Sequence, residues 1–363
     1  MKSKAMVLEA FRESLSLIEV EIPPLEEGQI LVKLQASGVC GSDVHMWNGE
    51  DPRVPLPIIL GHEGVGTVVD LKGVKRTVDG DPINPGDNII WNRGVTCGKC
   101  YYCTVLKEPS LCENRRVYGI NIPLNEKPYL NGCYAEHIIL RTGTDIFTAP
   151  ENINPSILVS SSCSGATCAH AFDMLTEHLT GKTVVVQGPG PLGVWAVVFA
   201  RSLGAFQVFV IGGSTERLEL CKDFGATNIL NRHETTPGER KSAVLSVTHG
   251  RGADLVIEAV GAHGAVEEGI GLLRKGGTYL STGYAQPAGL ESIDFYRDVV
   301  FRNIRIQGVW VNDTSHLKQA INLIQQNPTL FEKLITQKFS LEETNEALIA
   351  MKEKKVVKAV LEM

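Results

Sequence analysis

A glycine-rich turn in the middle of the chain restricts the fold more than any other feature. It reads Gly188-Pro189-Gly190-Pro191-Leu192-Gly193, and it follows the apolar residues 183–187 and opens a helical pattern over 191–203. Glycines at such a turn let the backbone approach a pyrophosphate, which the amides at the helix N-terminus then hold. A strand, this turn and a helix in this order predict a dinucleotide-binding unit.

The residues after this turn alternate between apolar runs and helical patterns. The apolar runs cover 207–211, 254–258, 277–281 and 305–309, and the helical patterns cover 215–224, 237–248 and 264–273. Strands that are apolar throughout belong in a parallel sheet covered on both faces. The sequence therefore predicts a doubly wound α/β domain over residues 156–309.

The remaining residues favour β-structure. Short β-branched runs at 30–34, 66–69, 88–91 and 137–140 are separated by loops rich in Gly and Pro. After residue 310 we expect a helix opened by Asp313-Thr314-Ser315, a strand at 335–339, a helix at 341–351 and a strand at 356–361. This tail has no partner of its own, so we expect residues 310–363 to join residues 1–155 in one β-rich domain. A chain of 363 residues is long enough for two cores.

The composition excludes several classes of function. The net charge is -6, so nothing indicates a nucleic-acid partner or a membrane surface. No run approaches the roughly 18 apolar residues that span a bilayer, and residues 1–4 lead into a strand-like segment rather than a signal peptide. Nine cysteines, four of them clustered, fit reduced thiols that bind metal better than disulfides. We therefore expect a cytoplasmic protein.

The clustered cysteines have the spacing of a metal site. Cys97, Cys100 and Cys103 form two overlapping C-x-x-C steps, and Cys112 follows. Four thiolates saturate a tetrahedral zinc ion, which is typical of structural rather than catalytic zinc. The alternative is four unrelated thiols, which the compact spacing disfavours.

A second set of metal donors is spread over the first 163 residues. Cys40 and His62 supply a sulfur and a nitrogen, and Cys163 lies at the seam between the β-rich region and the nucleotide domain. Two thiolates and one imidazole leave the fourth tetrahedral position open, which marks catalytic zinc. Cys168 is the rival for the third ligand, and a buried thiol and a core imidazole are the other interpretation of the first two residues. We expect two zinc ions per chain, one catalytic and one structural.

The cofactor's ribose lacks its usual partner. A carboxylate that binds the 2′-hydroxyl is expected about 20 residues after the glycine-rich turn. That place reads Val210-Ile211-Gly212-Gly213-Ser214, without a carboxylate. A 2′-phosphate would not be repelled there, and Ser214 or Arg217 could bind it, although Arg217 could equally be a solvated helix residue. Both NAD and NADP stay open at this point.

With these motifs, the chain resembles the zinc-dependent medium-chain alcohol dehydrogenase family over nearly its whole length. Gly61-His62-Glu63-Gly64-Val65-Gly66 is similar to the family's G-H-E-x-x-G, and Cys40-Gly41-Ser42-Asp43 is similar to its C-G-S-D. The four clustered cysteines match its structural zinc lobe. The segment Cys163-Ser164-Gly165-Ala166-Thr167 matches the one that carries its third zinc ligand.

The resemblance implies a GroES-like catalytic domain joined to a Rossmann domain. It implies a small alcohol or carbonyl substrate, a zinc ion that polarises the substrate oxygen, and NAD or NADP as the hydride acceptor. Relatives are dimers or tetramers built through the nucleotide domain, so the resemblance also implies a homo-oligomer.

The resemblance assigns roles to further residues. Ser42 and His45 stand at the positions of a proton relay that runs through the cofactor ribose. Asp43 matches the carboxylate that orients the zinc-bound His, and Glu63 matches an acid that moves onto the metal. Thr167 resembles the residue beside the nicotinamide.

Three departures from the family pattern bear on substrate and cofactor. The gap from Cys103 to Cys112 is one residue longer than the commonest spacing, and Gly212 replaces the ribose acid. Arg93 stands where several relatives place an aromatic pocket wall. With Asn92 it favours a polar or anionic substrate, while a structural salt bridge is the other role for Arg93.

Two alternative functions follow from these departures and from the fold. Within the family, the alternative is a polyol or amino-alcohol dehydrogenase of the sorbitol or threonine type. Outside enzymes, it is a nucleotide-binding or redox-sensing protein that keeps the fold as a scaffold. The complete ligand set, together with Ser42 and His45, argues against the sensor.

Overall fold

The computed structural model describes all 363 residues, which divide into two compact units. The first unit comprises Met1–Ala166 and Val311–Met363, and the second comprises Thr167–Trp310. The first unit thus continues past the expected boundary at 155, because α2 (Pro155–Leu158) and η3 (Val159–Ser161) pack against its strand β3. The chain passes into the second unit within α3 (Ser164–Asp173).

The first unit is built on a seven-stranded sheet in the order β10-β6-β5-β3-β18-β17, with β9 also paired to β3. Its strands are β3 (Ile30–Val39), β5 (Gly64–Leu71), β6 (Asn88–Trp91), β9 (His137–Leu140), β10 (Ile146–Thr148), β17 (Ile335–Phe339) and β18 (Lys358–Glu362). Strand β18 pairs antiparallel with β3, and β17 lies parallel beside it. The C-terminal tail therefore shares a sheet with β3.

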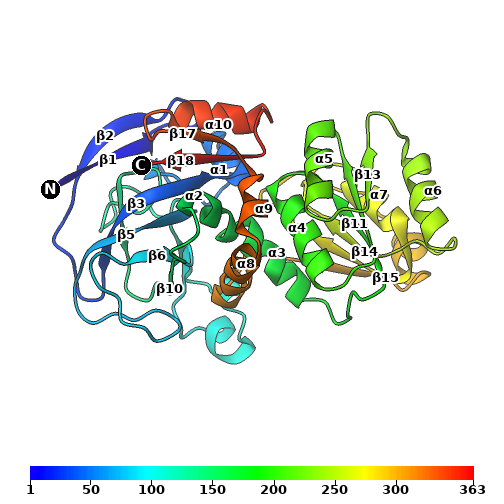
Figure 1. Ribbon diagram of the computed structural model, residues 1–363, viewed down its shortest axis with the longest axis horizontal. Helices are drawn as coiled ribbons and strands as arrows, with labels where there is room; N and C mark the ends of the chain where they lie inside the picture. Colours follow the sequence, from blue (N-terminus) through cyan, green and yellow to red (C-terminus); the bar gives the residue numbers. More distant parts are fainter. The chain divides into compact units, whose positions relative to one another are not determined.

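Smaller elements complete the first unit. A three-stranded sheet contains β2 (Ser16–Glu21), β1 (Lys2–Leu8) and β4 (Ile58–Ile59), and a short ribbon pairs β7 (Gly94–Val95) with β8 (Arg116–Val117). The helices are α1 (Gly41–Trp47), α8 (Thr314–Gln326), α9 (Pro328–Glu332) and α10 (Thr344–Lys352). Asp313 caps α8 by accepting a hydrogen bond from the Thr314 amide, as its sequence predicts. Figure 1 shows α10, in red, beside β17 and β18.

The second unit is a six-stranded parallel sheet in the order β13-β12-β11-β14-β15-β16. The strands are β11 (Thr183–Gln187), β12 (Gln207–Gly212), β13 (Asn228–Asn231), β14 (Ala253–Glu258), β15 (Leu273–Ser281) and β16 (Arg305–Gly308). The order reverses between β11 and β14, which is the switch point of a doubly wound dinucleotide-binding sheet. The α/β fold class with a β-rich domain and a doubly wound domain is confirmed.

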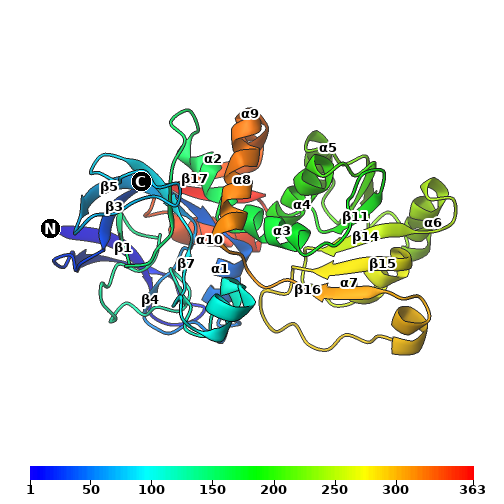
Figure 2. The same cartoon turned by 90° about the horizontal axis from the view of Figure 1, so that it is seen from below.

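Helices cover both faces of this sheet. They are α4 (Pro191–Ser202), α5 (Thr215–Asp223), α6 (Pro237–Val247) and α7 (Ala265–Leu272). Figure 1 shows α4 and α5 on one side of the strands and α6 and α7 on the other, and Figure 2 shows β14, β15 and β16 side by side. No helix in the chain is both long enough and apolar enough to cross a bilayer.

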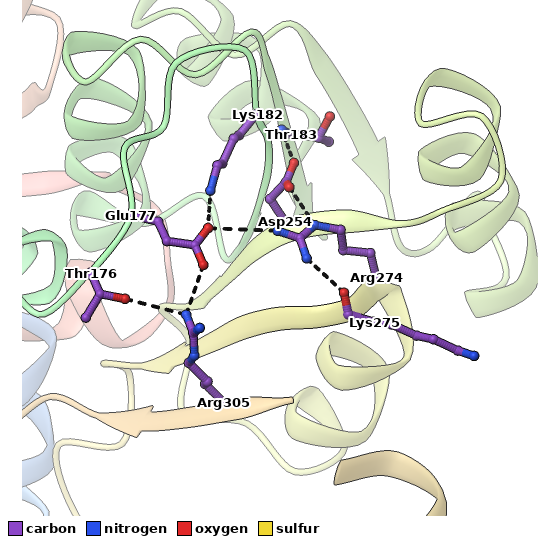
Figure 3. A network of polar contacts seen from close by, with 8 residues as sticks. All are labelled: Thr176, Glu177, Lys182, Thr183, Asp254, Arg274, Lys275 and Arg305. Carbon is purple, nitrogen blue, oxygen red and sulfur yellow. Dashed lines mark hydrogen bonds and ion pairs between the residues drawn. The ribbon is translucent and has the colours of Figure 1, made fainter. Parts of the chain in front are cut away.

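An ion-pair network fastens the edge of the sheet where the strands begin (Figure 3). Glu177, in the loop before β11, lies 3.0 Å from Arg305 Nη1 and also pairs with Lys182. Asp254 Oδ1 lies 2.7 Å from Arg274 Nε, and Asp254 Oδ2 accepts a hydrogen bond from the amide that begins β11. The glycine-rich turn lies at the opposite, carboxyl edge of the strands, because it follows Gln187 at the end of β11.

Candidate active site

Four potential metal donors of the first unit converge on one point. Cys40 precedes α1, His62 and Glu63 precede β5, and Cys163 precedes α3, and one donor atom from each lies within 4.8 Å of all the others. The sulfurs of Cys40 and Cys163 are 3.8 Å apart. Two Zn–S bonds of about 2.3 Å at a tetrahedral angle place their sulfurs about 3.8 Å apart. The spacing of the thiols therefore fits zinc.

The orientation of His62 fits a metal ligand as well. Its Nδ1 lies 3.1 Å from Asp43 Oδ1, and both side chains are fully buried. Its Nε2 is buried and has no hydrogen-bond partner in the protein. Burial lowers the pKa of His62, but the Asp43 carboxylate outweighs it and raises the pKa to about 9. The ring therefore directs Nε2 to the metal position. Carboxylates that bind the other ring nitrogen orient zinc-bound imidazoles in this way.

Asp43 is itself held from two sides. Its Oδ2 accepts a hydrogen bond of 2.7 Å from the Cys40 amide and one of 3.0 Å from the Tyr134 hydroxyl. The first of these closes the N-terminus of α1, so the same carboxylate caps the helix and orients His62. One residue therefore links the backbone of one metal ligand to the ring of another.

Of the two thiols, Cys40 is the one placed for ionisation. The Cys163 thiol beside it lowers the pKa of Cys40 more than burial raises it, and His62 and the Lys358 ammonium lower it further. Arg93 Nη1 donates a hydrogen bond of 2.8 Å to Cys163 Sγ. The Cys40 thiol and burial raise the pKa of Cys163, and the charge of Arg93 opposes them. Metal binding requires thiolates, so in the absence of an ion Cys40 is the thiol that its neighbours favour as a thiolate.

Glu63 is paired with a lysine rather than left free. Its Oε2 lies 2.6 Å from Lys358 Nζ, and the two side chains are 0% and 1% exposed. Burial lowers the pKa of Lys358, but the Glu63 carboxylate outweighs it and raises the pKa. A Cβ at Gly38 of β3 would lie 2.0 Å from Glu63 Oε2, so a glycine is needed there to make room for this pair.

The two expected relay residues lie on α1. Ser42 Oγ is buried and has no hydrogen-bond partner. His45 Nδ1 lies 2.5 Å from Glu50 Oε2, and its side chain is 38% exposed. Because residues three apart share a helix face, α1 places a buried hydroxyl and a surface imidazole on one side.

The four clustered cysteines form a second donor set. One sulfur from each of Cys97, Cys100, Cys103 and Cys112 lies within 4.8 Å of the others. The Cys97 amide donates to Cys112 Sγ over 3.3 Å. Backbone amides lower the pKa of Cys97 to about 6, as suits a thiolate ligand. Cys103 lies in η1 (Tyr102–Leu106), and with the longer gap to Cys112 the four sulfurs still lie together.

The glycine-rich turn of the second unit has the form of a phosphate cradle. Gly188 has φ +107°, and a Cβ at Gly193 would lie 1.7 Å from Gly188 O. A Cβ at Gly190 would meet nothing within 4 Å, so this side of the turn is open. Gly190 precedes Pro191 and Leu192 of α4, whose N-terminus has no side-chain cap. Its amides are therefore available to a pyrophosphate.

The two candidate thiols, Cys163 before α3 and Cys168 within it, have different surroundings. The Cys168 sulfur donates to Leu192 O over 3.1 Å in the glycine-rich turn, whereas the Cys163 sulfur lies among the metal donors. Thr167, next to Cys168, is buried in the same helix. Cys133 and Cys221 are buried free thiols.

The end of β12 shows why no carboxylate is present. A Cβ at Gly212 would lie 2.4 Å from Pro189 Cγ, so the glycine-rich turn leaves no room for a side chain there. Ser214 caps α5, with its Oγ accepting from the Arg217 amide over 3.4 Å. Burial lowers the pKa of Arg217.

The structural salt bridge considered for Arg93 is wrong. No carboxylate lies within 4.0 Å of its guanidinium, and its contact is with a thiol instead. The Asn92 side chain also has partners within the protein, since it donates to Thr314 Oγ1 and accepts from the Gly94 amide. Each polar atom of the Asn92 side chain therefore already makes one hydrogen bond within the protein.

Lys358 and Arg115 were not anticipated from the sequence. Lys358 lies in the otherwise apolar run Val356-Val357-Lys358-Ala359-Val360-Leu361, and a lone charge in such a strand was the available signal. Arg115 lies in a polar loop segment that carries no signal of its own.

Comparisons with known proteins agree with this geometry. Residues 191–326 match the family model for zinc-binding dehydrogenases, and residues 26–151 match that for the alcohol dehydrogenase GroES-like domain. A 5-exo-hydroxycamphor dehydrogenase from Pseudomonas putida is 35% identical over 95% of this chain and 94% of that protein.

Solved structures extend the likeness to the whole fold. An alcohol dehydrogenase from Thermotoga maritima has a TM-score of 0.97 at 50% identity, covering 100% of this chain and 99% of that one. A protein from Sinorhizobium meliloti 1021, assigned as a zinc-binding dehydrogenase and bound to NADP, has a TM-score of 0.86 at 27% identity, with both chains fully covered. This chain belongs to the zinc-dependent medium-chain alcohol dehydrogenase family.

Proposed function

We propose that this protein is a zinc-dependent alcohol dehydrogenase that transfers a hydride between an alcohol or its carbonyl product and NAD(P). The observation that carries this proposal is the meeting of Cys40, His62 and Cys163 at the spacing of a tetrahedral zinc site. Three protein ligands leave one position for the substrate oxygen, because Glu63 is held by Lys358. The four-cysteine set would hold a second, structural zinc ion.

The chain's own residues supply positioning and proton transfer. When bound, zinc would polarise the substrate oxygen and the nicotinamide would take the hydride. Ser42 would accept the hydroxyl proton of the substrate, and its buried Oγ, which has no hydrogen-bond partner in the protein, supports this role. His45 lies on the same helix face at the surface and passes a proton to solvent, with Glu50 beside it. Asp43 keeps the ring of His62 in a fixed orientation throughout.

NADP is the cofactor that the end of β12 favours. A Cβ at Gly213 would lie 2.7 Å from His233 Nε2 and 3.3 Å from Arg232 Nε, so two basic side chains lie beside the residue that follows Gly212, the position of the missing carboxylate. Ser214 adds a hydroxyl at the N-terminus of α5. Basic groups and helix amides suit a 2′-phosphate. Thr167, Gly188, Gly190, Pro191, Leu192, Gly193, Ser214 and Arg217 would make up the cofactor site.

A homo-oligomer, a dimer or a tetramer, is part of the same proposal. Strand β16 is at the edge of its sheet, and Ile306 on it is 42% exposed. Tyr296 and Phe301, just before this strand, are 72% and 61% exposed. Apolar groups beside an unpaired strand edge are suited to a second copy of the chain. A cytoplasmic location is likewise proposed, because all nine cysteines are free thiols and two thiolate metal sites need reducing conditions.

A polyol or amino-alcohol dehydrogenase is the second candidate. Arg93, where an aromatic wall is common in the family, favours a polar substrate over a hydrophobic alcohol. The complete ligand set argues against a nucleotide sensor without turnover.

The test is nicotinamide reduction by a panel of hydrophobic alcohols, polyols and hydroxy acids, with NAD and NADP compared. Cys40→Ser should abolish turnover while the cofactor still binds, and Cys221→Ala should keep turnover. Unchanged turnover in metal-free protein would reject the proposal.

A further inference from the structure

Arg93 is a buried cation without a carboxylate partner. It follows β6, is 5% exposed, and uses Nη1 to donate to Cys163 Sγ over 2.8 Å. Its Nε is buried and has no hydrogen-bond partner. A guanidinium carries five N–H donors, so a single contact with a thiol leaves most of its donor capacity unused.

Arg115 adds a second cation close to Arg93. A Cβ at Gly94, the residue after Arg93, would lie 2.2 Å from Arg115 Nε, so Arg115 packs directly against this backbone. Its Nε is also buried without a partner, and its Nη2 donates to Asn312 O over 2.9 Å. Burial and the charge of Arg93 lower the pKa of Arg115 to about 10.

The other buried charges around the metal donors are all paired. Lys358 has Glu63 at 2.6 Å, and His62 has Asp43 at 3.1 Å. The partly exposed Arg53 has two hydrogen bonds to the buried Asp51 carboxylate, at 2.9 and 2.5 Å. Leaving a buried cation unpaired costs free energy, and two neighbouring cations repel each other as well. An anion brought by a ligand would satisfy both guanidinium groups.

We infer that Arg93 and Arg115 form an oxyanion subsite beside the catalytic metal donors, so that the preferred substrate is a hydroxy compound carrying a carboxylate or a phosphate. The inference rests on the proposed dehydrogenase function and names its substrate class. Because Arg93 touches Cys163, an anion held by its free donors lies next to the position where the substrate oxygen binds. Planar guanidinium groups bind carboxylate and phosphate oxygens with charge-assisted hydrogen bonds.

A binding experiment tests the subsite without knowledge of the substrate. The zinc-loaded protein is titrated with glycolate and, separately, with inorganic phosphate at constant ionic strength, and the thermal shift gives an apparent Kd. We expect one of them to bind at 10 mM or below, and both Arg93→Gln and Arg115→Gln to weaken it about tenfold or more. Arg76→Gln, which changes an exposed arginine of a distant loop, should leave the Kd unchanged.

A matched substrate series supplies the second arm. Sorbitol, gluconate and sorbitol 6-phosphate share a carbon skeleton, so kcat/KM with NADP compares a neutral, a carboxylate and a phosphate compound. Among the compounds that are oxidised, the kcat/KM of an anionic one should exceed that of sorbitol at least about tenfold, both in the wild type and in Arg76→Gln. Arg93→Gln should remove this preference mainly through KM, with Arg93→Lys restoring part of it.

The outcomes separate the subsite from the dehydrogenase function. Oxidation of neutral alcohols with no anion binding, or with equal anion binding in Arg93→Gln and Arg115→Gln, overturns the subsite and leaves the function standing. Arginine-dependent anion binding without oxidation of any alcohol supports the subsite and overturns the function. Zinc content is measured in every variant, and Arg115→Gln decides the case if Arg93→Gln loses zinc by releasing Cys163.

Discussion

His62 Nδ1 lies 3.1 Å from Asp43 Oδ1, with both side chains excluded from solvent. The carboxylate fixes the ring so that Nε2 is presented to the metal, and it is itself held by Tyr134 and the Cys40 amide. Asp43→Asn should lower zinc affinity at this site about 10–100-fold, as loss of such outer partners does. Chelator competition measures this affinity, with the exposed Asp70→Asn as control. Equal affinities for the two variants would contradict the role given to Asp43.

Lys358 should stabilise the fold through Glu63. Lys358→Met leaves a fully buried carboxylate without its cation, and we expect a loss of about 3–5 kcal/mol in the free energy of unfolding. Lys358→Met with Glu63→Gln removes both charges and should recover much of that loss. Urea unfolding of zinc-loaded protein measures each. Lys338→Met, which breaks an exposed pair on neighbouring β17, should cost only about 0–1 kcal/mol, and an equal cost for both lysines would refute the account.

The four-cysteine lobe should hold zinc independently of the first site. Cys100→Ser removes one of four thiolates, so zinc content should fall from two ions per chain to one. The first unit should lose at least about 2 kcal/mol, which lowers Tm by about 4–8 °C. Elemental analysis and thermal melting measure both effects, with Cys221→Ala as control. Two retained zinc ions in Cys100→Ser would show that the lobe is not a site.

His137 should make stability depend on pH. Burial lowers its pKa below 6.5, Lys33 lowers it further, and Glu136 opposes them. Below about pH 6.5 the unfolded chain therefore binds more protons at this residue than the folded one, so its contribution to stability is present above pH 6.5 and is lost as pH falls through the folded pKa. Between pH 7 and pH 5, zinc-loaded wild type should lose more stability than His137→Gln. The exposed His178→Gln should behave as wild type, and parallel curves for all three proteins would contradict this origin.

Much of the fold follows from local pattern. Strands β6 and β11 have the bounds predicted from their apolar runs, because such runs end at Gly, Pro or polar residues on both sides. Strand β13 was missed, since it is four residues long, begins and ends with Asn and is only partly buried. The first unit also extends further than expected, because only packing shows that α2 and η3 cover β3.

The metal ligands could be predicted from their spacing in the sequence, whereas the residues that surround them could not. Short motifs marked Cys97 to Cys112 as well as Cys40 and His62, because ligands close in sequence are close in space. The pairing of Lys358 with Glu63 joins residues almost 300 positions apart, and the packing of Arg115 against Gly94 depends on the β7–β8 ribbon. Such contacts arise from tertiary structure and carry no local signature.

Anomalous diffraction at the zinc edge from crystals of the purified protein tests the central claim most directly. We predict two peaks per chain, one among the four clustered cysteines and one about 2.3 Å from the sulfurs of Cys40 and Cys163 and about 2.0–2.1 Å from His62 Nε2. A single peak at the four-cysteine lobe, in protein that oxidises alcohols at full rate, would contradict the account.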